Sequence, residues 1–87
     1  PGMPEAMMHR GTYEWLRGKK KKAQNWWQRG ADMGEELNVH FDTGRLYLEM
    51  GKRGQDKDSL QRAASIFRET QSQWELVQAQ EWLGKVG

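Results

Sequence analysis

The chain has 87 residues, 36% of them hydrophobic, and a net charge of +2. A chain of this length forms one small domain with a modest core. It has no cysteine, which excludes disulfides and thiolate metal sites and fits a reducing, cytoplasmic compartment. No apolar run is long enough to span a bilayer, so no membrane association is expected.

The basic residues are concentrated near the beginning of the chain. Residues 1–29 contain seven Lys or Arg and two Asp or Glu, whereas residues 30–87 contain seven and ten. The excess therefore forms a local basic patch rather than a property of the whole chain. Its members are Arg17, Lys19, Lys20, Lys21 and Lys22.

Helix-forming residues dominate and no proline follows Pro4, so an all-α fold is predicted. Apolar residues recur every three or four positions, which predicts five helices. Their ranges are 5–17, 20–37, 39–50, 57–70 and 73–83. Gly18, Gly51 and Gly54 lie in polar stretches and are expected in turns. Ser72 has the spacing to Glu75 of a capping box at the start of the fifth helix.

Four glycines fall inside the predicted helices: Gly11, Gly30, Gly34 and Gly44. Each destabilises a helix interior by about 1 kcal/mol relative to alanine. We therefore expect them where the backbones of neighbouring helices approach closely.

The chain resembles itself when it is shifted by 33 residues. Small residues align with small residues and large apolar residues with large apolar residues. The aligned pairs are Gly11 with Gly44, Gly18 with Gly51, Trp27 with Leu60, Gly30 with Ala63, Ala31 with Ala64, and Met33 with Ile66. A two-helix repeat of about this length is typical of tetratricopeptide arrays.

The segment 40–52 resembles the first helix of a tetratricopeptide repeat, with a small residue at Gly44, an aromatic at Tyr47 and a glycine at Gly51. Positions of the second helix and of the first copy are matched by Leu60, Ala63, Ile66, Phe67, Gly11, Gly18, Ala23, Trp27 and Gly30. Asp56 and Glu14 depart from the family pattern. The resemblance implies a single domain of antiparallel helix hairpins, an α-solenoid fragment with repeat 1 at 5–37, repeat 2 at 38–70 and a capping helix at 72–84.

A finer resemblance concerns the order Trp15-Leu-Arg-Gly18, a basic run, Trp26-Trp27, Glu35-Glu-Leu37 and Gly44-Arg45. It is similar to the carboxy-terminal repeat region of bacterial signalling proteins. These join a class III nucleotide cyclase or protein kinase domain to an AAA-type ATPase domain. The resemblance implies a docking or sensor arm of a longer signalling protein.

The tetratricopeptide resemblance also implies a binding surface, because the first helix of each repeat lines the concave face in that family. The residues that it places there are Met8, Thr12, Trp15, Leu16, Phe41, Arg45, Leu48 and Glu49. Trp15 and Arg45 are residue types that anchor peptides, although Trp15 could instead pack between helices. The expected role is a protein–protein interaction scaffold that binds a polypeptide segment or the rest of its own longer chain.

Two other roles remain open. The basic patch, followed by Trp26 and Trp27, could bind nucleic acid or an acidic surface, with indoles stacking on bases. Trp27 lies on the predicted apolar stripe, however, so a core position is favoured and specific nucleic-acid recognition is not expected. Alternatively the segment is structural, and Trp74 and Trp82 cover a neighbouring repeat or a second copy in a homodimer, because two repeats fall short of the usual three.

No catalytic, cofactor or metal site is expected. His9 and His40 are the only histidines, and each has too few potential ligands near it in the sequence for a metal site. The acidic pairs Glu35-Glu36 and Asp56/Asp58 are expected to serve as helix caps or solvated charges.

Overall fold

The computed structural model describes residues 3–86, which form five α-helices and, within that range, no strand. The helices are α1 (Pro4–Leu16), α2 (Lys20–Leu37), α3 (His40–Gly54), α4 (Lys57–Glu69) and α5 (Gln73–Lys85). The predicted all-α fold of about five helices is confirmed. The predicted bounds are close for every helix except α3, which continues beyond residue 50.

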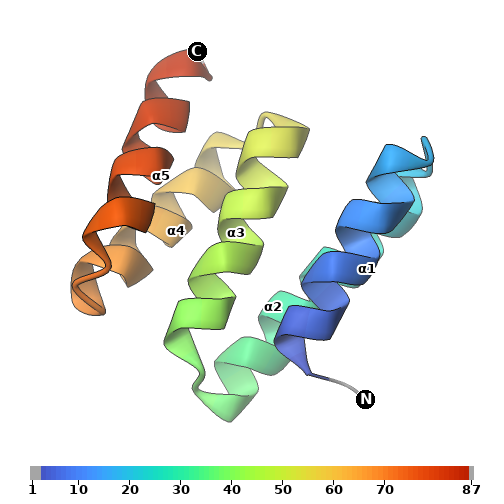
Figure 1. Ribbon diagram of the computed structural model, residues 1–87, viewed down its shortest axis with the longest axis horizontal. Helices are drawn as coiled ribbons and strands as arrows, with labels where there is room; N and C mark the ends of the chain where they lie inside the picture. Colours follow the sequence, from blue (N-terminus) through green and yellow to red (C-terminus); the bar gives the residue numbers. More distant parts are fainter. Residues whose placement is uncertain (1–2, 87) are drawn as a thin grey trace.

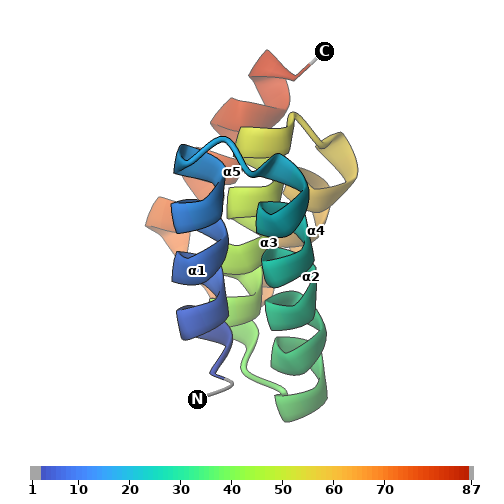
Figure 2. The ribbon, with the colours of Figure 1, turned by 90° about the vertical axis from the view of Figure 1, so that its right-hand side faces the viewer.

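Successive helices reverse direction and stack in two layers (Figure 1). α1, α3 and α5 lie side by side in one layer, and α2 and α4 lie behind them. α1 packs mainly on α2 and α3 mainly on α4, so two helix hairpins are followed by α5, which packs on α4. Figure 2 looks onto the first hairpin and shows α3 behind it. The molecule measures 30 × 28 × 17 Å, a flat stack of helices.

The turns between helices contain residues in the left-handed conformation: Gly18, Asn38, Gln55 and Gln71, with φ of 81°, 62°, 56° and 58°. The predicted turn at Gly18 is confirmed. The turns expected at Gly51 and Gly54 are wrong, because both residues belong to α3. Gln55 takes the left-handed conformation that ends this helix, a position more often held by glycine.

Of the two side-chain caps expected at helix starts, the one at Asp56 is present and the one at Ser72 is absent. Asp56 caps α4, since its carboxylate accepts a hydrogen bond from the backbone N–H of Asp58 at 3.2 Å and from the hydroxyl of Ser59 at 2.7 Å. Ser72 stands at the N-cap of α5 but makes no capping hydrogen bond. Its hydroxyl pairs with that of Thr70 at 2.6 Å, so the expected capping box is wrong.

One hydrophobic core lies between the two layers of helices. Its largest fully buried side chains are Trp27, Phe67, Leu46, Leu60 and Pro4. The indole N–H of Trp27 donates to the backbone carbonyl of Met8 at 3.0 Å. The one polar atom of this buried side chain is therefore satisfied, and the hydrogen bond joins α2 to α1.

The interior glycines lie at close contacts between helices, as expected. A Cβ at Gly11 would overlap the indole of Trp27, and a Cβ at Gly44 would lie 2.7 Å from the ring of Phe67. In each hairpin, therefore, an aromatic residue of the second helix fills the space beside a glycine of the first. The cost of glycine in the helix is offset by this burial of an aromatic ring.

Candidate functional site

The layer formed by α1, α3 and α5 has a hollow of about 220 Å³ to which all three helices contribute. α1 contributes Met8 and α5 contributes Glu75 and Gln78, whereas the remaining residues, Arg45, Leu48, Glu49 and Lys52, come from α3. Met8 and Leu48 are both buried, at 6% exposure, and give the hollow an apolar floor. Charged and amide groups surround this floor, so an apolar side chain and a polar backbone could be held together.

Glu49 is the centre of a polar network on this face. Its carboxylate accepts hydrogen bonds from the hydroxyl of Thr12 at 2.6 Å and from Nε of Arg53 at 2.9 Å, and Nζ of Lys52 lies 2.9 Å away. Burial by itself would raise the pKa of Glu49, but the hydrogen bonds from Thr12, Lys52 and Arg53 together lower it below 4.5. Glu49 is therefore a fixed negative charge that joins α3 to α1.

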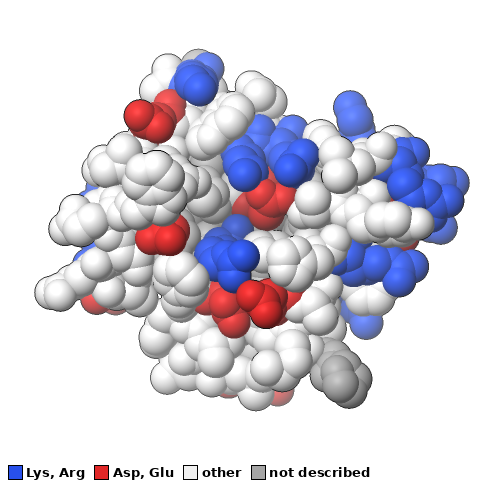
Figure 3. Space-filling view, in the orientation of Figure 1, with Lys and Arg blue, Asp and Glu red and all other residues white. Residues whose placement is uncertain are grey.

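Arg45 forms a second charged group next to the hollow. Its guanidinium lies 3.1 Å from the carboxylate of Glu5 and 3.8 Å from that of Asp42. It also lies 5.9 Å from the ring centroid of Phe41. Figure 3 shows basic and acidic atoms side by side over the middle of this face. Ion pairs at a surface contribute little stability, so a ligand carboxylate could replace Glu5 at Arg45 at small cost.

The structure brings together only part of the residue set that was expected on the binding face. Met8, Arg45, Leu48 and Glu49 line the hollow, and Thr12 reaches it through its hydrogen bond to Glu49. Three other expected residues lie outside it: Trp15, Leu16 and Phe41. Trp15 packs against Trp27, with ring centroids 5.6 Å apart. Leu16 is 73% exposed, and Phe41 packs against Phe67 with centroids 6.1 Å apart.

Lys52, Glu75 and Gln78 were not predicted as site residues. Lys52 lies in the part of α3 that extends past the predicted end, so its place on the binding face was missed. Glu75 and Gln78 belong to α5, which the sequence indicates only as a capping helix. A third copy of the 33-residue shift aligns Gln78 with Arg45, and this signal could have placed it on the same face.

The predicted basic patch is exposed at all five residues, from Arg17 to Lys22. Figure 3 shows Lys and Arg atoms gathered along the edge where Figure 1 places α1 and the beginning of α2. One of the lysines has a contact within the chain, since Nζ of Lys20 lies 5.2 Å from the ring centroid of Trp15. The patch is thus a solvated surface at the turn between α1 and α2.

The same edge carries an alternating row of cations and aromatic rings, which we call the arginine–aromatic ladder: Arg17, Tyr13, Arg10, Trp26 and Arg29. The distances from guanidinium carbon to ring centroid along this row are 5.3, 6.0, 5.2 and 4.6 Å. The buried carboxylate of Glu14 holds the row in place, since it lies 3.0 Å from Nε of Arg10 and 3.6 Å from a guanidinium nitrogen of Arg17. Arginine side chains therefore contact both rings of this row, the exposed Tyr13 and the half-buried Trp26.

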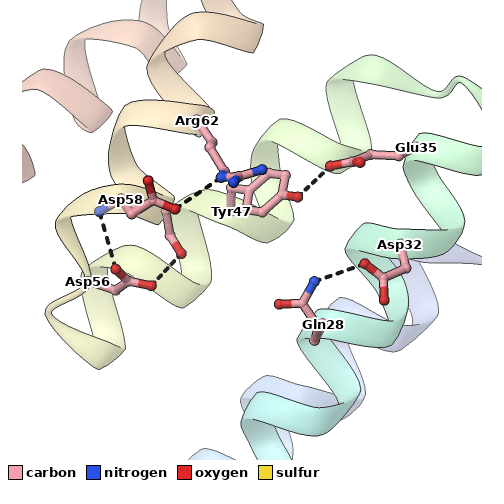
Figure 4. A network of polar contacts seen from close by, with 8 residues as sticks. Gln28, Asp32, Glu35, Tyr47, Asp56, Asp58 and Arg62 are labelled. Atoms are coloured by element: carbon pink, nitrogen blue, oxygen red, sulfur yellow. Dashed lines mark hydrogen bonds and ion pairs between the residues drawn. The ribbon is translucent and has the colours of Figure 1, made fainter.

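A second groove of about 270 Å³ lies on the other layer, between α2 and α4 (Figure 4). Tyr47 of α3 lies at its base, its hydroxyl donates to Glu35 of α2, and Arg62 of α4 lies 5.7 Å from its ring centroid. Burial, followed by the hydrogen bond to Glu35, raises the pKa of Tyr47 to about 12. No sequence pattern indicates this groove, because it depends on the distance between α2 and α4.

Four carboxylates line this second groove, and each has a donor within the chain. Asp32 accepts from Gln28 at 2.9 Å, Glu35 from Tyr47, Asp56 from Ser59 and Asp58 from Arg62 at 3.0 Å. Glu35 thus makes a contact between helices, and Asp56 caps α4. The groove is better described as a network of polar contacts that joins α2, α3 and α4 than as a cation site.

His9 and His40 are both exposed. Within residues 3–86, no three His, Asp or Glu side chains are grouped so that they could hold a metal ion. Among the helices described, none has the length and apolar character needed to cross a membrane. Comparison with known proteins found no matching family model, no matching curated protein and no matching solved structure.

Proposed function

We propose that this chain is a protein–protein interaction module that binds a polypeptide segment across the face formed by α1, α3 and α5. The observation that carries this proposal is the hollow built by all three helices, with the apolar floor of Met8 and Leu48. Arg45 and Lys52 stand beside that floor, where Arg45 pairs with Glu5 and Lys52 pairs with Glu49. The ligand that fits best is an extended segment with an apolar side chain next to an acidic one. We propose no catalytic role for the chain.

The assignment of the two hairpins to tetratricopeptide-like repeats is part of this proposal, as is a cytoplasmic role in a longer signalling protein. The repeat assignment is supported by the agreement between the repeated sequence and the repeated contacts. Gly11 and Gly44, which align at a shift of 33, each meet an aromatic side chain of the next helix. An array of such hairpins presents its first helices as one continuous surface.

The basic patch supports the alternative role less well. Stacking on nucleic-acid bases needs exposed aromatic faces. Trp27 is fully buried, and the half-buried Trp26 is already in contact with the guanidinium groups of Arg10 and Arg29. What remains is a set of exposed cations, which is sufficient for nonspecific attraction to polyanions but provides no base recognition.

Peptide binding at the hollow can be tested by selecting peptides from a random display library on the native chain and measuring their affinity for two variants. Gln78→Trp fills the hollow from α5, and Arg45→Ala removes the cation. Either should weaken a selected peptide about tenfold or more. Gln61→Trp, on the exposed surface of α4, is the control and should leave affinity unchanged.

Peptides that bind Gln78→Trp and Arg45→Ala as well as the native chain would contradict the proposal. Loss of binding at raised salt, together with loss on neutralising Lys19 to Lys22, would instead favour the electrostatic role.

A further inference from the structure

α5 occupies the same place in the repeated sequence as α1 and α3. A second shift of 33 residues aligns Trp74 with Phe41, Val77 with Gly44, and Gly84 with Gly51. The structure agrees with this alignment, because α1, α3 and α5 lie side by side in one layer (Figure 1). The surroundings of α3 can therefore be compared with those of α5, position by position.

On α3 these aligned positions are covered by α4. A Cβ at Gly51 would overlap the side chain of Leu60, and a Cβ at Gly44 would press against Phe67. Phe67 also packs against Phe41. Leu60 and Phe67 are both fully buried by this contact, so the pairing of α4 with α3 contributes much of the core.

On α5 the same positions are uncovered. Trp74 is 71% exposed and Val77 46% exposed, and a Cβ at Gly84 would meet nothing within 4 Å. The opposite side of α5 already packs on the core, through buried Ala79 and partly buried Leu76, Trp82 and Leu83. The expectation that Trp82 covers another repeat or copy is therefore not supported, and only Trp74 of that pair faces outward. We call the uncovered row of Trp74, Val77 and Gly84 the α5 stripe.

We propose that the α5 stripe binds an amphipathic helix of another polypeptide, in the way that α4 covers α3. The incoming helix places a leucine-sized side chain against Gly84, as Leu60 does at Gly51. It places a small residue against Val77, because the Val77 side chain fills the space that Phe67 takes at Gly44. Trp74 then covers that end of the helix, in the position of Phe41. This site uses a different side of α5 from the hollow and goes beyond peptide binding there.

A second copy of the chain fits the stripe less well. Its helices with the required pattern, α2 and α4, bury Trp27, Leu60 and Phe67 completely in their own core. They cannot present these side chains to a neighbour without unfolding. An antiparallel pair of α5 helices that set Trp74 against Gly84 of the other copy would place Val77 against the carboxylate of Glu81, which is an unfavourable contact.

The probe for this site is a synthetic peptide with the sequence of residues 55–71 carrying Phe67→Ala, so that the residue facing Val77 is small. It is titrated into the ¹⁵N-labelled native chain, and nuclear magnetic resonance follows the indole N–H of Trp74. We expect shifts confined to α5. A matched peptide that also carries Leu60→Asp should produce no shifts. It lacks the leucine that would fill the open space beside Gly84, which we call the notch.

The decisive variant is Gly84→Leu, which fills the notch of the stripe where free space exists and so leaves the fold intact. It should weaken binding of the probe about tenfold or more. Arg45→Ala, on α3, should leave this binding unchanged, and Gly84→Leu should leave the peptides that bind the hollow unaffected, so the two proposals can fail separately.

Three results would overturn the inference: equal affinity for Gly84→Leu, shifts spread over α3 and α2 because the peptide displaces α4, or no shift at all. Concentration-dependent dimerisation of the native chain in sedimentation, abolished by Gly84→Leu, would assign the stripe to a second copy instead.

Discussion

Leu60 of α4 occupies the space into which a side chain at Gly51 of α3 would project. The two helices therefore touch at a point where a single methyl group decides how closely they pack. Gly84 holds the aligned place on α5, yet nothing fills the space beside it. Packing therefore requires glycine at this place of the repeat in α3, but not in α5.

Gly51→Ala should destabilise the chain, and Gly84→Ala should not. At Gly51 the new methyl group overpacks the core, at a cost of about 1–3 kcal/mol that exceeds the gain in helix propensity. At Gly84 the free space leaves only the gain in propensity, up to about 1 kcal/mol. Urea unfolding of both variants, followed by circular dichroism, measures the difference. Equal stability of the two would contradict the packing described for Leu60.

Trp27→Ala should remove most of the stability of the domain. It deletes a fully buried indole and its hydrogen bond to Met8, at a cost of about 3–5 kcal/mol. That loss is comparable with the total stability of a small domain. Trp74→Ala is the matched control, because this indole is 71% exposed and should shift thermal unfolding little. A cooperative native-like transition in Trp27→Ala would be inconsistent with its place in the core.

Tyr47 should ionise near pH 12, well above the ordinary value of 10. The folded state holds the phenol proton more tightly, so this contribution to stability is complete below pH 10 and is lost as pH rises toward 12. Ultraviolet absorbance of the phenolate gives the titration, with exposed Tyr13 as the second tyrosine in the chain. Glu35→Gln should lower the pKa of Tyr47, since it removes the negative charge that accepts the hydrogen bond of the Tyr47 hydroxyl. An unchanged titration in this variant would rule out that contact.

Glu49 should make the folded state sensitive to acid. Its pKa is lowered on folding, so its contribution to stability is present above about pH 4.5 and is lost as pH falls through the folded value. Glu49→Gln should be less stable than the native chain at neutral pH and lose less stability on acidification. Urea unfolding at neutral and acidic pH tests this. Parallel loss in both proteins would show that Glu49 is not the group responsible.

Lys21→Glu should raise the stability slightly. The first turn of α2 contains no acidic residue, and the lysines there oppose the helix dipole. Replacing one exposed lysine by glutamate should contribute about 0.3–1 kcal/mol at low salt and less at high salt. Thermal unfolding at two salt concentrations checks the sign. A loss of stability would mean that Lys21 has a structural contact.

The apolar spacing in the sequence was sufficient to locate the helices. The stripe from Ala23 through Trp27 to Leu37 predicted the bounds of α2 as they stand. The end of α3 was misplaced because Gly51 lies among polar residues, as turn glycines do. The reason for that glycine is its contact with Leu60, which lies in another helix and has no local signal.

Part of the candidate site was expected, on the resemblance to tetratricopeptide repeats rather than on the residue pattern alone. Met8, Arg45, Leu48 and Glu49 were expected on one face and do line one hollow. The pairing of Tyr47 with Glu35 could not be foreseen, because it depends on how α2 and α3 pack against each other. The exposure of Trp74 also depends on what lies beside α5 rather than on its own sequence.

The arginine–aromatic ladder has a consequence for assembly. It covers the α1–α2 edge with charged groups that are held by Glu14, so a helix approaching there would have to desolvate Arg10 and Arg29. The opposite edge offers Trp74, Val77 and an open notch. If the α5 stripe binds a helix as proposed, helices are added at this edge and not at the α1–α2 edge, so an assembly built from the chain extends in one direction.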